Sequence, residues 1–351
     1  MDSNTMVTKE TKNKIRVDYE GKLSFKERLQ SKLKASNTWI KAGVTVIRFI
    51  LMLGVSYVIL YPFFARIAGS FMTKEDVLNA TVTFIPRNFT LDIYRYIIIE
   101  NHYLEALLNT LLLSLACALI QMLVSCLIGY GLAKFKFKGN KLVMAAVIIT
   151  MIIPHMTLKR SLIQHFTDFD ILTIIGLGYD GPIELIFGEA LKLSNTFWPL
   201  IILSVCGLAF KNGLYIYLMR QFFKGVPDEL EESAYVDGAG TFRTFFQIIL
   251  PLAVPMMITV FLFSFSWQWT DEFYTTIFFI NPDPTTKVYL MPDIYTNIPE
   301  SLIFKGFIGQ SRFNTVIRNT AGMMIIAPLI ILYLFCQKYL VQGIERSGLV
   351  G

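Results

Sequence analysis

The apolar positions of the chain gather into six long runs, which polar and charged segments separate. Each run has, or nearly has, the roughly 20 apolar residues that a helix needs to cross a bilayer. A helix in a soluble core normally keeps a charged face, and these runs lack one. We therefore predict an all-α integral membrane protein with six transmembrane helices. Their expected bounds are about 44–68, 106–133, 142–158, 196–219, 252–277 and 316–337.

The composition favours a membrane protein and excludes several other classes. Of 351 residues, 54% are hydrophobic and only 17% are charged, whereas a soluble protein carries about 25% charged residues. An ordinary soluble enzyme, a disordered protein and a disulfide scaffold are therefore excluded. The four cysteines all lie inside apolar runs, where we expect them to act as small core residues.

No catalytic motif is visible in the sequence. It contains no phosphate-binding loop, no nucleophile elbow and no paired-histidine zinc motif. The three histidines do not have metal-ligand spacing either. We therefore expect no enzyme activity, no metal site and no directly bound cofactor. If the protein uses nucleotide energy, a separate chain must bind the nucleotide.

Basic residues near the ends of the runs predict the orientation of the helices. Residues 1–41 form an arm with more Lys and Arg than Asp and Glu, and the loop 134–141 holds four lysines and no acid. Because positively charged loops stay in the cytoplasm, we expect both termini to be cytoplasmic. The net charge of +6 comes mainly from the arm, so we expect no nucleic-acid partner. The arm's pattern suits a helix on anionic membrane lipids, and a solvated basic tail fits it equally well.

An acidic segment at 227–251 lies on the expected cytoplasmic side between two runs. It has the local signals of a helix, a turn and a second helix. Asp228 is a good N-cap, and Glu231 would complete a capping box with it. Gly238 and Gly240 would end the first helix and permit a positive φ angle.

The second helix of this hairpin is expected to start at Thr241, and the next span at Pro251. Favourable interaction with the helix dipole, at roughly 0.3–1 kcal/mol per residue, explains some of the acidic residues. It does not explain why an amphipathic hairpin stands between two membrane spans.

The spacing of residues in the hairpin resembles a known motif. Glu-x-Ala-x-x-x-Gly is followed, after nine residues, by Ile-x-Leu-Pro. This pattern is similar to the cytoplasmic coupling motif of binding-protein-dependent ABC importer permeases, and the resemblance implies contact with an ATPase subunit. The residues to which it assigns this coupling are Glu232, Ala234, Asp237, Gly238, Ile248, Leu250 and Pro251.

Other stretches resemble the carbohydrate-uptake members of this family, such as the six-span permease of the maltose system. They are Leu-Tyr-Pro-Phe-Phe at 60–64, the segment 85–91, Trp-Thr-Asp-Glu-Phe at 269–273 and the C-terminal segment 337–343. By this resemblance, residues 42–351 form the transmembrane domain of a type I ABC importer.

The resemblance also implies a set of partners in the bacterial plasma membrane. The chain would pair with a second permease subunit, as a heterodimer, and with two ATPase subunits that bind ATP and Mg. An extracytoplasmic solute-binding lipoprotein would deliver a sugar or oligosaccharide. The alternative is a secondary transporter or channel that is not coupled to an ATPase. Such proteins tend to show internal repeats with broken helices, and the sequence shows no convincing repeat.

Four residues are candidates for the translocation path or for substrate contact. Trp269, Asp271 and Phe273 lie near the end of the fifth run, where aromatic rings would either stack on a sugar or form an interfacial belt. Lys211 lies inside the fourth run, where a lysine without a partner costs about 2.5–3.5 kcal/mol. It either lines the path and attracts acidic groups of a sugar, or it snorkels to the interface or pairs with a carboxylate of the sister permease.

Overall fold

The computed structural model consists of two compact units, Met1–Arg66 and Ile67–Gly351. The predicted lipid-binding helix of the N-terminal arm lies outside the residues that the structure describes. Those residues are 7–10, 16–19, 36–170, 183, 190–279, 287–296 and 310–348.

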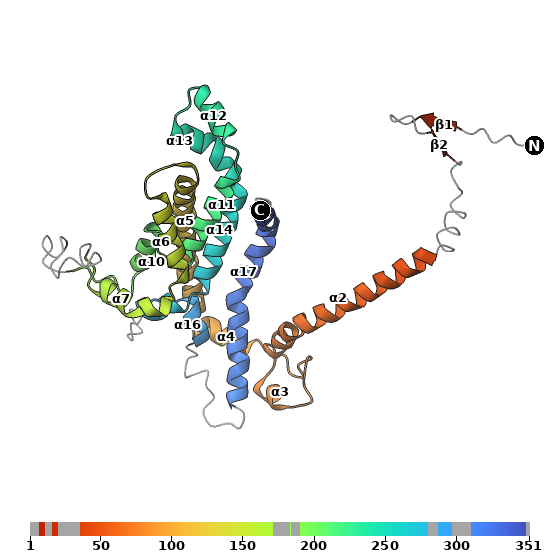
Figure 1. The fold of residues 1–351 in the computed structure, drawn as a ribbon. Coiled ribbons are helices and arrows are strands. Elements are labelled where there is room, and N and C mark those ends of the chain that lie inside the picture. Colours follow the sequence, from red (N-terminus) through yellow and green to blue (C-terminus); the bar gives the residue numbers. More distant parts are fainter. Residues whose placement is uncertain are drawn as a thin grey trace, which may run out of the picture. The chain divides into compact units, whose positions relative to one another are not determined.

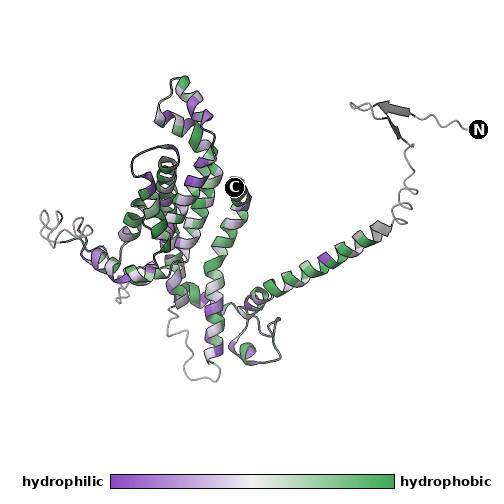
Figure 2. Ribbon diagram, in the orientation of Figure 1, coloured by the Kyte–Doolittle hydropathy of each residue, from purple (hydrophilic) through white to green (hydrophobic). Residues whose placement is uncertain are grey.

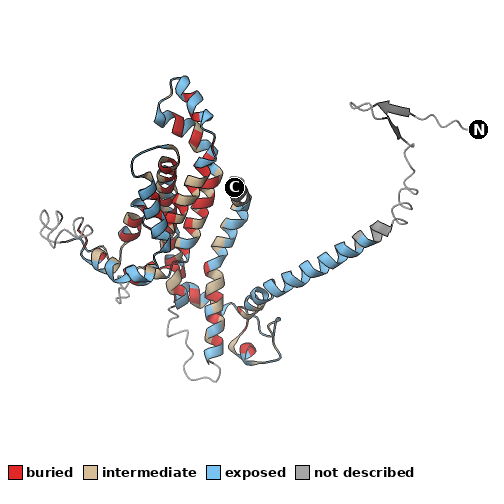
Figure 3. Ribbon diagram, in the orientation of Figure 1, coloured by how far each residue is buried: buried red, intermediate tan, exposed pale blue. Residues whose placement is uncertain are grey.

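The first unit contains a short β-hairpin and most of a long apolar helix. Strand β1 (Val7–Glu10) pairs with β2 (Arg16–Tyr19) in antiparallel orientation, although no strand is predicted for the arm. Helix α2 (Ser36–Gly69) covers the first predicted span. None of the residues in the most apolar window of its membrane-length segment, Gly43–Gly69, is buried, as Figure 3 also shows. Apolar surface of this extent is typical of a helix that meets lipid or packed protein.

Three helical segments of the second unit are long and apolar enough to cross a membrane. They lie in α5 (Tyr103–Lys134), in the segment Thr241–Trp269 and in α17 (Gln310–Gly348). Apolar residues follow the length of these helices (Figure 2). With the segment in α2, the described residues hold 4 such helices, or up to 5 if one bent pair is a single span. The prediction of a helical membrane-spanning protein is confirmed, but three of the six predicted spans are not continuous helices. One of them is the fifth, 252–277, whose helix ends at Trp269 and is followed by a separate helix from Phe273.

The third predicted span, 142–158, is bent into two helices. These helices, α6 (Asn140–Ile152) and α7 (His155–Thr167), meet at an angle of 99°. Pro154 explains the bend, because a proline disfavours helical backbone at the residue before it. Ile153 accordingly has an extended ψ angle of 121°.

The fourth predicted span, 196–219, is also interrupted. A non-helical link separates α10 (Trp198–Val205) from α11 (Asn212–Lys224). Within this link Gly207 and Lys211 have positive φ angles of 70° and 64°. Such backbone suits glycine, whereas a lysine seldom adopts it. The prediction of one uninterrupted helix over this run is therefore wrong.

Helix α5 is the centre of the second unit. Helices α10, α11 and α14 (Leu250–Trp269) pack around it, and α17 packs against α14 (Figure 1). The close approach of α5 to α11 depends on Gly129, where a Cβ atom would lie 2.6 Å from the Cβ atom of Met219. Glycine at such a crossing allows two membrane helices to come close together.

A buried polar network joins three of these helices. The side-chain amide of Gln121 on α5 donates a hydrogen bond to the Ser204 hydroxyl on α10 at 3.1 Å. The Ser264 hydroxyl on α14 donates to the Gln121 carbonyl oxygen at 2.7 Å. All three residues are almost fully buried. Since no water competes for these groups in the bundle interior, the network fixes the register of α5, α10 and α14.

Short helices complete the second unit. Residues in α5 and just before it bind α16 (Met291–Thr296): the Thr110 hydroxyl accepts the Met291 N–H at 2.9 Å. The Asn101 amide, just before α5, donates to the carbonyl oxygen of Ile294 at 3.0 Å. The short helices are α3 (Lys74–Leu78), α4 (Asp92–Ile99), α15 (Phe273–Phe278) and α16 (Met291–Thr296).

Candidate functional site

The acidic segment forms the expected helical hairpin. Its first helix is α12 (Glu229–Val236), and its second, α13 (Thr241–Thr244), continues through the π-helix η1 (Phe245–Ile249) into α14. Gly238 has a φ angle of 81°, which confirms the positive φ predicted there. Gly240 does not, since its backbone is extended, with φ −78° and ψ 166°.

The predicted capping box of α12 is wrong, because the Asp228 side chain has another partner. It makes no capping hydrogen bond to the helix. Instead, the ammonium group of Lys134, at the end of α5, lies 2.5 Å from an Asp228 carboxylate oxygen and donates to the Val226 carbonyl oxygen at 2.6 Å. The Lys134 side chain is only 6% exposed. Its hydrogen bond and its charge lower the pKa of the Asp228 carboxyl.

The glutamates of α12 point in different directions. Glu231 is buried, and one of its carboxylate oxygens has no hydrogen-bond partner. Burial raises the pKa of Glu231, while the positive charge of Lys134 partly opposes this shift. Glu229 and Glu232 are exposed. Of the two, Glu232 is the residue that the motif assigns to coupling, and its carboxylate is accessible to another chain.

The other predicted coupling residues divide between the surface and the interior. Asp237, Gly238 and Pro251 are exposed, whereas Ile248 and Leu250 are half-buried. Ala234 is buried. Ile248, Leu250 and Ala234 therefore belong to the packed interior of the hairpin. The exposed coupling residues are accessible to a partner.

The hairpin also exposes apolar side chains that the sequence motif does not include. Val236 is 87% exposed and Phe242 is 81% exposed, and Phe246 is exposed as well. The sequence alone could have revealed these residues, because they are apolar residues in an otherwise charged loop. A cluster of exposed large apolar residues is typical of a protein–protein contact.

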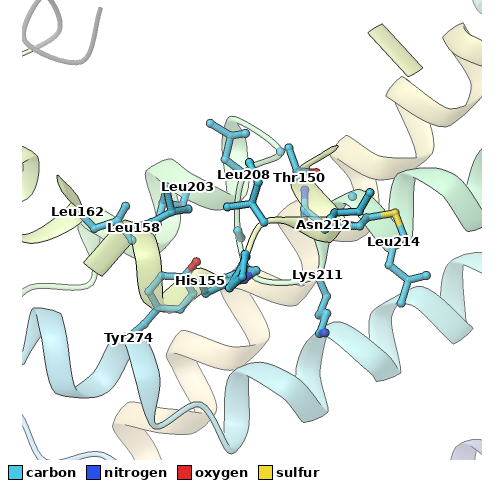
Figure 4. Close-up of a pocket in the computed structure, with 17 residues that line it drawn as sticks. Thr150, His155, Leu158, Leu162, Leu203, Leu208, Lys211, Asn212, Leu214 and Tyr274 are labelled. Carbon is cyan, nitrogen blue, oxygen red and sulfur yellow. The ribbon is translucent and has the colours of Figure 1, made fainter. Parts of the chain in front are cut away.

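The two helix breaks of the second unit meet at one cavity of about 540 Å³. Its wall includes the bend around Pro154 and the link from Gly207 to Lys211, together with His155 and Tyr274 (Figure 4). Non-helical backbone at membrane depth is tolerated where protein buries it or where it lines a cavity. The cavity is therefore a second candidate site, in addition to the hairpin.

Lys211 lies in the wall of this cavity. Its ammonium nitrogen is 4.9 Å from the centre of the Phe210 ring and 5.2 Å from that of the Trp267 ring. Cation–π attraction of this kind stabilises a partly desolvated cation. Among the described residues, no carboxylate forms an ion pair with it.

The other three predicted path residues do not line the cavity. Trp269 is buried, and its indole N–H donates to the carbonyl oxygen of Ile325 on α17 at 2.9 Å. An Asp271 carboxylate oxygen accepts the N–H of Tyr274 at 3.0 Å. Phe273 is half-buried, with its ring centre 6.4 Å from that of His155.

The sequence did not single out His155 and Asn212, which do line the cavity. Tyr274, one of the aromatic residues near the end of the fifth run, lines it as well. The proline before His155 was a usable signal, because it marks the end of α6. Asn212 also had a usable signal, because Gly213 follows it and an Asn-Gly pair is typical of a turn.

A cavity between interrupted membrane helices, combined with an exposed hairpin between two spans, defines a membrane transport protein. The chain belongs to the family described as binding-protein-dependent transport system inner membrane components, whose sequence pattern matches residues 121–346. It is therefore a multi-pass transport permease subunit that acts with a binding protein.

Relatives of this chain match it over most of their length. The probable ABC transporter permease of Pyrococcus horikoshii is 26% identical over 296 residues, which is 83% of this chain and 92% of the relative. The polygalacturonan/rhamnogalacturonan transport system permease of Bacillus subtilis is 26% identical over 306 residues, 86% and 96% of the two chains. The maltodextrin transport system permease of Streptococcus pneumoniae is 28% identical over 301 residues, 86% and 93%.

A solved structure shows the same fold. It is the crystal structure of a bacterial ABC transporter involved in the import of the acidic polysaccharide alginate. The TM-score is 0.60 at 17% sequence identity, and the match covers 91% of this chain and 99% of the other.

Proposed function

We propose that the chain is the permease subunit of an ATP-driven importer that moves a sugar or oligosaccharide across the plasma membrane. Relatives with a stated substrate include permeases for polygalacturonan or rhamnogalacturonan, for starch degradation products, for maltodextrin, for alpha-glucosides and for galactooligosaccharides. Separate ATPase subunits bind ATP and Mg and drive transport through the hairpin 227–251. The chain itself holds no catalytic residue in this proposal.

The observation that carries this proposal is the hairpin itself. Exposed Glu232 and the exposed apolar side chains of Val236 and Phe242 form a surface that fits another protein. Lys134 joins the start of the hairpin to the end of α5. A partner that moves the hairpin would therefore also move the spans, as a rigid-body transition between two states of the permease requires.

The remaining partners follow from the family and from charge. Membership of the family supports a second permease subunit as a neighbour. The lysine-rich loop 134–141 adjoins the hairpin through Lys134, which supports a cytoplasmic position for both and hence for both termini. An extracytoplasmic solute-binding lipoprotein would deliver the sugar on the opposite side, in a bacterial plasma membrane.

The alternative function is a secondary transporter or channel without an ATPase. The interrupted helices around the cavity are also typical of secondary transporters, so they do not separate the two classes. The hairpin favours the importer, because a transporter driven by an ion gradient has no use for a protein-binding lever between two spans.

Transport in sealed vesicles tests the proposal. The chain would be expressed with its sister permease, ATPase subunits and binding protein, and uptake of radiolabelled oligosaccharides would be measured. We expect uptake only when ATP is present on the side of the membrane that carries the hairpin and the binding protein is present on the opposite side. Uptake driven by an ion gradient in the absence of ATP would instead establish the alternative.

Replacement of Lys134 by methionine is expected to weaken coupling without preventing assembly. The variant leaves the Val226 carbonyl oxygen without its buried donor, so the hairpin is no longer fixed to α5. Loss of such a charge-assisted hydrogen bond predicts a roughly threefold to tenfold decrease in uptake per ATP hydrolysed. The exposed Lys138 in the same loop provides the control, because Lys138→Met removes the same charge. Equal ratios in the two variants would contradict this role of Lys134.

A further inference from the structure

Lys134 lies at the joint between α5 and the hairpin, close to two carboxylates of which it pairs with one. Its ammonium group contacts the exposed Asp228 and donates to the Val226 carbonyl oxygen. These two contacts leave one of its three N–H donors for another acceptor. The second carboxylate belongs to Glu231, which is buried and lies three residues after Asp228. The joint therefore holds one cation and two possible anionic partners.

The carboxylate of Glu231 lacks a partner that its burial demands. Its Oε1 atom makes no hydrogen bond to any described residue, and the buried hydroxyl of Tyr130 on α5 makes none either. Burial raises the pKa of the Glu231 carboxyl, whereas the charge of Lys134 and the Tyr130 hydroxyl lower it. Both groups of α5 therefore lie near this carboxylate. Since an unpaired oxygen of a buried charge is destabilising, an arrangement that pairs Glu231 competes with the one observed.

The spacing of these residues permits Lys134 to change its partner. Tyr130 and Lys134 are four residues apart on α5, so they share the face of that helix that meets the hairpin. The Tyr130 ring centre is 4.6 Å from that of Phe245 in η1. Asp228 and Glu231 have i, i+3 spacing at the start of α12, where side chains are neighbours. A lysine has a flexible four-carbon stem, so rotation of the Lys134 side chain is sufficient for the exchange.

Asp228 has a second use for its side chain if Lys134 leaves it. It precedes the first residue of α12, but its backbone is helical, with φ −70° and ψ −24°, and its side chain makes no capping hydrogen bond. A capping residue typically has extended backbone and accepts an N–H two or three residues later. Capping by Asp228 thus requires a rotation about its ψ angle. Because this bond joins α12 to the preceding chain, the rotation would turn α12 relative to α5.

We propose that Lys134 exchanges Asp228 for Glu231 during the transport cycle, and that this exchange turns the hairpin relative to α5. The structure shows the first state, in which Lys134 contacts Asp228. In the second state Lys134 binds Glu231, and Asp228 caps α12. Glu231 is then a positioning residue, which acts on coupling through Lys134. This inference rests on the proposed function, because the ATPase subunits would drive the exchange.

Distances between two spin labels test the exchange in the complete importer. The labels would be attached after Lys138→Cys and Val236→Cys, at exposed positions of the loop 134–141 and of α12. The four native cysteines would be replaced first. The distance would be measured without nucleotide and after trapping with ATP and vanadate. In the wild type we expect two distances whose populations change on trapping.

Two variants should hold the hairpin in opposite states. Glu231→Gln keeps the volume of the side chain but removes the charge, so it should hold the distance of the first state in both conditions. Asp228→Asn removes the charge that attracts Lys134 but caps a helix equally well, so it should hold the other distance in both conditions. Loss of a charge-assisted hydrogen bond predicts a shift of roughly tenfold or more in the ratio of the two populations. Uptake per ATP hydrolysed should decrease in both variants.

The control is Glu229→Gln, which removes the same charge from an exposed position of α12 and should show the wild-type distances in both conditions. Equal distances in Glu231→Gln and Asp228→Asn, or a wild-type response of either to trapping, would reject the exchange. A wild type with one unchanging distance would reject it as well. If Glu231→Gln does not assemble, Glu231→Asp replaces it, because the shorter side chain should not reach Lys134. In each case ATP-dependent uptake by the wild-type complex would leave the proposed function intact, whereas its absence would reject that function itself.

Discussion

Replacement of Glu232 by lysine is expected to abolish transport while the protein still inserts into the membrane. Glu232 is exposed on α12 and makes no ion pair with any described residue, so its loss does not disturb the fold of the hairpin. The acidic hairpin implies a basic surface on its partner, and like charges across an interface cost several kcal/mol. We expect uptake below about a hundredth of the wild-type level.

The control for this variant is Glu75→Lys, which makes the same charge change at an exposed position of α3. It should leave uptake close to the wild-type level. Co-purification of the ATPase subunits with each variant locates the defect. Undiminished uptake by the Glu232→Lys protein, with ATPase subunits still bound in normal amount, would refute the assignment of the hairpin to coupling.

Replacement of Gly129 by alanine is expected to destabilise the bundle strongly. The added Cβ atom would lie 2.6 Å from the Cβ atom of Met219 and 2.9 Å from the backbone nitrogen of Arg220. Backbone atoms of a packed helix cannot move aside locally, so α5 and α11 must separate. Overpacking of this kind costs typically about 1–3 kcal/mol. The measurement is the midpoint of thermal unfolding in detergent.

Gly131 provides a matched control two residues further along α5. A Cβ atom at Gly131 would meet nothing within 4 Å. Because alanine favours helix over glycine by roughly 1 kcal/mol, Gly131→Ala should raise the unfolding midpoint slightly. Equal midpoints for the two variants would show that the contact between α5 and α11 is not limited by Gly129.

The hairpin was predictable because most of its signals act within a few residues. Acidic residues at the start of α12 and a glycine at its end indicate a helix and a turn whatever surrounds them. The predicted role of Asp228 was wrong for a reason that no local pattern contains. Its carboxylate is bound by Lys134, which is 94 residues earlier in the chain.

The cavity could not be predicted because it depends on where helices stop. An apolar run shows that a segment belongs in the membrane, but the counting of apolar residues does not show where its backbone hydrogen bonds end. Pro154 gave a local signal for one break. The other break has Lys211 in left-handed backbone, which the residue type does not predict.

The position of Trp269 at the end of the fifth run could not be interpreted from the sequence for a similar reason. A position near a span end fits a belt at the interface or a sugar-binding wall. Trp269 is instead buried against α17, where its indole N–H has a backbone acceptor. Only the packing of two helices that are far apart in the sequence determines this outcome.

The continuity of the segment Thr241–Trp269 has a mechanical consequence. It is a single rod of 29 residues, or roughly 43 Å at 1.5 Å per residue, and the hairpin stands at one end while Trp269 is bonded to α17 at the other. A tilt of a few degrees at the hairpin displaces the far end by several ångströms without any change inside the rod. The signal between the two ends therefore needs no relay of side chains. Flexion is expected at two places only, the wider turn at Phe245–Ile249 and Pro255 inside α14, whose ring removes a helix hydrogen bond.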